Sequence, residues 1–124
     1  LNQRKKYDVA AAYAHRAMKL GKLLENEYLY PFIAIIYIEA LAGQGEDEKA
    51  RELLPYIFDV KFEGYEPHVQ TRLLLQQGMA YAVLGEKEKA INITLKVHQL
   101  IVSLHLKDLE VHYEFQKLRK LLEE

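Results

Sequence analysis

The sequence Glu39-Ala-Leu-Ala-Gly-Gln-Gly-Glu-Asp-Glu-Lys-Ala50 returns 40 residues later as Met79-Ala-Tyr-Ala-Val-Leu-Gly-Glu-Lys-Glu-Lys-Ala90. The two stretches align without a gap, and seven of their twelve positions are identical: Ala40/Ala80, Ala42/Ala82, Gly45/Gly85, Glu46/Glu86, Glu48/Glu88, Lys49/Lys89 and Ala50/Ala90. In each stretch, small alanines permit close helix packing, a glycine reverses the chain, and acidic residues begin the next helix. This order of features predicts stacked helical hairpins.

The segments between these turns carry apolar residues mostly at three- and four-residue steps, the period of an α-helix. Gly45 and Gly85 are predicted to end two of the helices, and residues 59–67 form the clearest loop. No stretch shows the sustained alternation of a β-strand. We therefore expect an all-α fold of antiparallel helical hairpins with about six helices, over residues 7–24, 32–42, from 46, 68–84, 86–106 and from 108.

Two prolines bear on where helices begin and end. Pro31 precedes an almost wholly apolar segment and suits the first turn of a helix, where no backbone N–H is needed. Pro55 lies inside the third helical pattern, where a regular interior would be destabilised by about 3 kcal/mol. Pro55 should therefore kink or end that helix, and both alternatives are open.

In the later stretch and the residue before it, a small residue, an aromatic residue, a turn glycine and an alanine at a close helix contact follow at set intervals: Gly78, Tyr81, Gly85 and Ala90. In this spacing the chain resembles the tetratricopeptide (TPR) repeat. The earlier copy matches at Gly45 and Ala50, whereas Ile38 replaces the small residue and Leu41 the aromatic one. The period of 40 residues exceeds the usual one of about 34. It is similar to the extended TPR units of bacterial signalling regulators and kinesin-light-chain-type adaptors.

The resemblance implies one TPR-like domain over residues 1–124. It would contain a partial repeat at 7–24, repeats at about 31–60 and 68–106, and a capping helix at about 108–123. The capping helix has one apolar face, which is formed by Val111, Phe115, Leu118 and Leu122.

The concave side of a hairpin stack is lined by the first helix of each pair. Carrying the family's groove positions onto this chain gives six protein-binding residues: Phe32, Ile35, Glu39, Arg72, Leu75 and Met79. The alternative is that the apolar members are plain core. The Lys and Asn residues with which some TPR units clamp a C-terminal carboxylate are missing here, so that class of ligand is not expected.

Residues able to carry catalysis or hold a metal ion do not form a recognisable pattern. The chain has no cysteine. His98, His105 and His112 recur every seven residues, about 10.5 Å apart along a helix, which is too far for one zinc ion. Ser103 is the only serine and lies outside any nucleophile motif. We expect a non-catalytic protein without a metal site or cofactor.

Charge and hydropathy also limit the partners. The 17 basic and 18 acidic residues give a net charge of −1, so nucleic acid is not an expected partner. The most apolar run, 29–42, has 14 residues, whereas a membrane helix needs about 20. A membrane is therefore not an expected partner. No signal peptide is recognisable, so a cytoplasmic protein is expected. Because the chain begins with Leu1 and not with Met, we also expect that it was cut from a longer polypeptide or processed.

These observations predict a protein–protein interaction module that binds a peptide, a helix or a neighbouring domain in an apolar groove. The alternative is a regulatory or sensor domain of a longer signalling or transcriptional regulator. A homodimer is a further open alternative, since short helical arrays expose apolar terminal faces unless these are capped.

Overall fold

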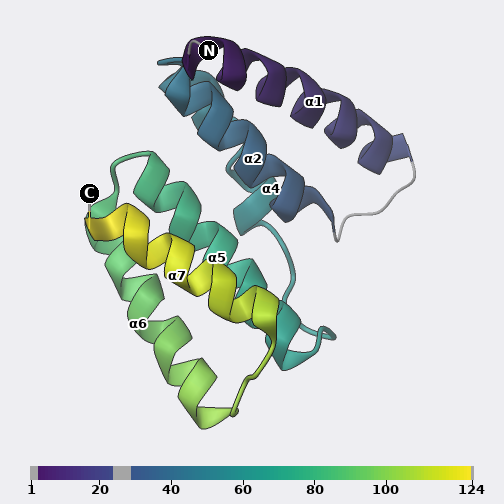
Figure 1. Ribbon diagram of the computed structural model, residues 1–124. Helices are drawn as coiled ribbons and strands as arrows, with labels where there is room; N and C mark the ends of the chain where they lie inside the picture. The colour runs from purple at the N-terminus through teal and green to yellow at the C-terminus, as the bar shows by residue number, and fades with distance from the viewer. Residues whose placement is uncertain (1–2, 24–28, 124) are drawn as a thin grey trace. The chain divides into compact units, whose positions relative to one another are not determined.

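The computed structural model describes residues 3–23 and 29–123, with side chains from Lys6 to Leu20 and from Leu29 to Glu123. Helices dominate these residues, and they contain no β-strand, which confirms the all-α prediction (Figure 1). Leu24, the expected end of the first helix, lies outside the described residues. In chain order the helices are α1 (Gln3–Leu23), α2 (Tyr30–Gly43), α3 (Asp47–Arg51), α4 (Pro55–Phe58), α5 (Pro67–Val83), α6 (Lys87–Ser103) and α7 (Leu109–Glu123).

The chain forms two compact units, Leu1–Val60 and Lys61–Glu124. The boundary falls inside the loop predicted at residues 59–67 and between the two expected repeats. The single TPR-like domain expected over residues 1–124 stays a prediction. We describe each unit by itself.

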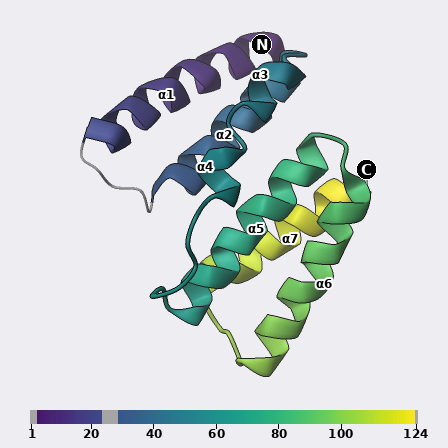
Figure 2. The ribbon, with the colours of Figure 1, turned by 180° about the vertical axis from the view of Figure 1, so that it is seen from behind.

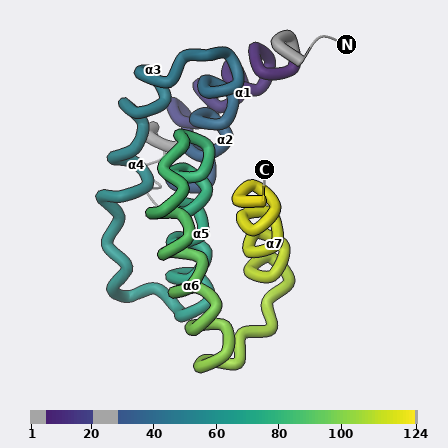
Figure 3. The backbone as a smooth tube through the Cα atoms, turned by 90° about the vertical axis from the view of Figure 1, so that its left-hand side faces the viewer, coloured from purple at the N-terminus to yellow at the C-terminus, as the bar shows by residue number. Residues whose placement is uncertain are grey.

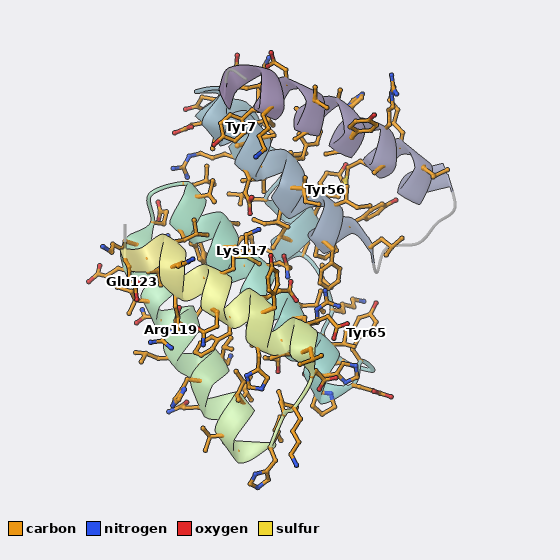
Figure 4. All side chains as sticks on the ribbon, in the orientation of Figure 1. Tyr7, Tyr56, Tyr65, Lys117, Arg119 and Glu123 are labelled. Carbon is orange, nitrogen blue, oxygen red and sulfur yellow. The ribbon has the colours of Figure 1, made fainter. Side chains whose placement is uncertain are left out.

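In the first unit, α1 runs alongside α2, and α2 also contacts α3 and α4 (Figures 1 and 2). Pro31 lies in the first turn of α2, as predicted, because its missing N–H would have no helical partner there. Tyr7 extends over the C-terminal end of α2 (Figure 4). The fully buried apolar side chains described in this unit include Ala34, Ile38, Ala50 and Ile57.

Pro55 ends one helix and begins another. α3 stops at Arg51, a turn follows, and α4 starts at Pro55. The turn is held by hydrogen bonds from Leu53 N–H to Ala50 O (3.1 Å) and from Leu54 N–H to Arg51 O (3.2 Å). Proline fixes φ near the helical value but lacks a donor, so it is accepted in a first turn and not in a helix interior. Of the two open alternatives, termination is the one observed.

The turns after α2 and α5 have the same backbone geometry. Gly45 and Gly85 adopt φ values of +80° and +82°, in the left-handed region that favours glycine. In both turns the amide of the residue after the glycine donates to a carbonyl five residues earlier, the hydrogen bond of the Schellman motif. These bonds are Glu46 N–H to Leu41 O and Glu86 N–H to Tyr81 O, each 2.8 Å. The predicted helix ends at these glycines are confirmed.

In the second unit, α5, α6 and α7 pack against one another, and α5 contacts both of the others (Figures 1 and 3). The predicted apolar face of α7 is largely confirmed, since Val111, Phe115 and Leu118 are buried and Leu122 is partly exposed. α7 therefore covers the hairpin formed by α5 and α6, as expected of a capping helix.

The turn between α6 and α7 differs from the prediction. α6 ends at Ser103, earlier than the expected residue 106. Leu106 N–H bonds to Ile101 O (3.1 Å), which repeats the hydrogen bond of the two glycine turns. His105 holds the position of the glycine and has a φ of +51°. A histidine in this conformation is uncommon, so the sequence carried no glycine signal for the turn.

Candidate functional site

The six residues expected to line a groove lie in α2 and α5, three in each helix. In α2, Ile35 is buried, whereas Phe32 and Glu39 are partly exposed. Because α2 and α5 belong to different units, the structure assigns no common surface to the six residues.

In α5, Leu75 and Met79 are only 0% and 2% exposed. α5 is packed against α6 and α7, so both residues lie in a helix with neighbours on more than one side. Their side chains therefore present almost no surface to a peptide. The alternative, that the apolar groove residues are core, agrees with the burial of Leu75 and Met79.

Arg72, the base expected in the groove, is paired with a carboxylate of α7. Its Nε donates to Glu114 Oε1 at 2.5 Å. Gln76, which is 1% exposed, donates from Nε2 to the other oxygen of the same carboxylate and to Arg72 O at 3.1 Å. Charge-assisted hydrogen bonds of this kind fix position as well as add stability. The Arg72–Gln76–Glu114 network therefore joins α5 to α7.

α6 carries a row of apolar side chains that face away from the core. Steps of four and seven residues place this row on one side of the helix. Val97, by contrast, is fully buried on the opposite side. We call the row the α6 stripe; its members are Ile91 (40% exposed), Leu95 (61%) and Val102 (59%).

α1 has an exposed row with the same four- and seven-residue steps, formed by Val9, Tyr13 and Leu20. The two helices differ in their support. α6 packs on both α5 and α7, whereas α1 packs on α2. A surface held from two sides loses less conformational freedom on binding, which favours the α6 stripe as a docking surface.

A cavity of about 340 Å³ lies in the first unit, between α1, α2 and the segment that contains α4. Tyr56, which lies on α4 and is labelled in Figure 4, forms part of its wall. The described residues that line the cavity are three tyrosines, two basic residues and two apolar residues: Tyr30, Tyr37, Tyr56, His15, Lys19, Met18 and Leu53.

The three histidines spaced by seven residues do not share one helix. His98 lies on α6 and stacks on Phe115 of α7 with ring centroids 6.2 Å apart. His105 lies in the turn, and His112 lies on α7 with its Nε2 2.9 Å from Leu106 O. In the part of the chain that the structure describes, no three His, Cys, Asp or Glu side chains come close enough to hold a metal ion.

The described helices include none with both the length and the apolar character needed to cross a membrane. Comparison of the chain with models of protein families, with curated proteins and with solved structures finds no match. Function is therefore inferred from the residues and geometry of this chain alone.

Sequence reasoning missed the α6 stripe and the cavity. Ile91, Leu95 and Val102 add a second apolar face to a helix whose core face already contains Ala90 and Val97, and this surplus is readable in the sequence. The cavity has no such signal, because its walls come from separate segments of the chain.

Proposed function

We propose that the chain is a non-catalytic protein-interaction module built from TPR-like helical hairpins. The matching turns at Gly45 and Gly85 support the TPR-like part of this proposal. Further support comes from pairs of residues 40 positions apart that share full burial. Ala50 and Ala90 are both 0% exposed, and so are Ile57 and Val97.

The α6 stripe is the observation that carries the proposal. Exposed apolar side chains gathered on one face of a surface helix are typical of interaction sites. Their steps of four and seven residues are also those of the apolar seam along which helices pair. We assign as partner an amphipathic helix of another protein, which would lay its apolar face along Ile91, Leu95 and Val102.

The α6 stripe replaces the groove as the proposed binding surface in the second unit. The groove residues Leu75 and Met79 are buried, whereas Leu95 can be contacted without any rearrangement of the fold. The cytoplasm is the compartment we assign to the module, since disulfides typical of secreted domains are impossible in a cysteine-free chain.

The test combines site-directed photo-crosslinking with capture from a lysate of the source cells. A benzophenone side chain at position 95 should crosslink to a partner, and the crosslinked peptide should belong to an amphipathic helix. The same group at position 92 is the control, because Asn92 is exposed on α6 but lies outside the stripe. The Leu95→Glu variant should lose the partner, while the Asn92→Glu variant should retain it.

Tyr13→Glu provides a second control, since it places the same charge in the exposed row of α1. Circular dichroism establishes that each variant is folded. Equal crosslinking at positions 92 and 95, or loss of the partner from Tyr13→Glu but not from Leu95→Glu, would contradict the assignment to α6. A crosslink from position 95 to a second copy of the chain would identify a homodimer instead.

A regulatory or sensor domain is the second candidate function. It is favoured by the cavity in the first unit, whose size and lining suit a small ligand. A sensor domain needs such a site, whereas a plain interaction module does not.

A further inference from the structure

The cavity of the first unit combines aromatic walls with basic side chains. Tyr30 and Tyr56 meet edge to face, with ring centroids 5.5 Å apart and an interplanar angle of 78°. His15 and Tyr37 also meet edge to face, at 6.0 Å and 83°, and Tyr37 Oη lies 3.3 Å from His15 Nδ1. Aromatic rings prefer such offset and edge-to-face contacts with one another. A flat aromatic ligand would find the same contacts against these walls.

The ionisable residues of the lining determine whether the cavity favours an anion or a cation. Tyrosine rings alone would attract a cation through their negative faces. Besides the tyrosines, however, the ionisable residues described in the lining are Lys19 and His15. The described lining residues include no acidic side chain. The lysine ammonium repels a cation and attracts an anion. The tyrosine hydroxyls can donate hydrogen bonds to a carboxylate as well.

The cavity is partly open to solvent, and its volume matches a small ligand. At about 340 Å³ it lies near the lower end of the range of about 300–1,000 Å³ for small-molecule sites. Met18 and Leu53 supply apolar contacts next to the rings. A ligand with one ring and a short acidic arm fits both the volume and the lining.

We propose that the first unit binds a small aromatic carboxylate in this cavity, with its ring among Tyr30, Tyr37 and Tyr56 and its carboxylate toward Lys19. This goes beyond the proposed protein interaction, which involves the α6 stripe of the other unit. The two proposals can therefore fail separately.

The test titrates the full chain with three probes of similar size and different charge: phenylacetate, phenylacetamide and phenethylamine. Binding is followed by amide chemical shifts in nuclear magnetic resonance spectra. Phenylacetate should bind with a Kd of about 1 mM or tighter. Its shifts should map to α1, α2 and α4. Phenylacetamide should bind about fivefold more weakly, as expected from the loss of one ion pair near the surface, and phenethylamine more weakly still.

Two substitutions on α1 separate the cavity from the general charge of the protein. Lys19→Met should weaken phenylacetate about fivefold and leave phenylacetamide unchanged. Lys6→Met removes the same charge from an exposed position of the same helix outside the cavity and should change neither. Tyr56→Leu should weaken both probes, because it removes an aromatic wall.

Three results would overturn the proposal. The first is an absence of phenylacetate binding. The second is binding of phenethylamine as tight as that of phenylacetate. The third is an equal effect of Lys19→Met and Lys6→Met, which would indicate nonspecific attraction to the basic surface. Circular dichroism of each variant guards against loss of the fold, and retained binding of phenylacetamide by Lys19→Met shows that the cavity is intact.

Discussion

Gly78 of α5 lies directly against Leu118 of α7. A methyl group built on Gly78 would stand 2.7 Å from Leu118 Cδ2 and 3.0 Å from Ile93 Cγ2 of α6. Both distances are shorter than ordinary carbon–carbon contacts of about 3.5–4.0 Å. The absence of a side chain at Gly78 thus lets three helices meet at one point.

Gly78→Ala is therefore expected to destabilise the second unit. Overpacking costs about 1–3 kcal/mol, and the higher helix propensity of alanine returns up to about 1 kcal/mol. We expect a net loss of about 1–2 kcal/mol in urea unfolding. In the double variant with Leu118→Ala, the loss should fall at least about 1 kcal/mol below the sum of the single losses. Additive effects would show that the two residues do not conflict.

Leu75→Ala and Leu95→Ala test which face of the second unit is core. Leu75 is 0% exposed, so its truncation should lower the free energy of unfolding by about 2–5 kcal/mol. Leu95 is 61% exposed, so the same change there should stay within about 0.5 kcal/mol. If Leu75→Ala were as mild as Leu95→Ala, Leu75 would be available to a partner after all.

His105→Gly is expected to stabilise the protein. The left-handed conformation costs a residue with a side chain about 1–2 kcal/mol, and glycine avoids this cost while losing about 0.5–1 kcal/mol of backbone entropy. The net gain should be about 0.5–1 kcal/mol. The reciprocal change, Gly85→Ala, should destabilise by about 1 kcal/mol, since Gly85 has a φ of +82°. Thermal unfolding of the two variants measures both effects. A Tm of His105→Gly below that of the parent chain would contradict the left-handed conformation of His105.

Glu114→Ala should break the link between α5 and α7. It leaves one N–H of the buried Gln76 amide and the Arg72 guanidinium without their carboxylate, which costs about 1–3 kcal/mol. Glu110→Ala, an exposed carboxylate on the same helix, should change the free energy of unfolding by less than about 0.5 kcal/mol. Equal effects would mean that the network contributes no more than a surface charge.

Truncation after Lys107 removes α7 and should unfold the second unit. Val111, Phe115 and Leu118 are buried, and each contributes about 1.5–3 kcal/mol through loss of contact with water. Truncation after Leu122 removes only the last two residues and should leave the unit folded. Circular dichroism and solubility distinguish the two products. A soluble, cooperatively unfolding 1–107 fragment would show that α7 is dispensable.

Local signals in the sequence predicted the helices and most of their ends. Pro31, Gly45 and Gly85 act through their own backbone geometry, so their effects are readable without a structure. The turn at His105 was missed because residues other than glycine rarely adopt a positive φ, so the residue type alone did not indicate a turn. The burial of Leu75 depends on the packing of helices distant in the sequence, and a periodic pattern alone does not separate a groove from a core.

Leu95 holds the position in the second expected repeat that Pro55 holds in the first, 40 residues earlier. This difference affects how readily each helical segment opens locally. Leu95 continues α6, which has 17 residues, whereas Pro55 divides its counterpart into helices of five and four residues. Helices shorter than about 12–15 residues are marginal by themselves. The amides of α3 and α4 should therefore exchange with solvent deuterium faster than those of α6. Since Leu53 and Tyr56 belong to this divided segment, its local opening would move part of the cavity wall without unfolding the first unit.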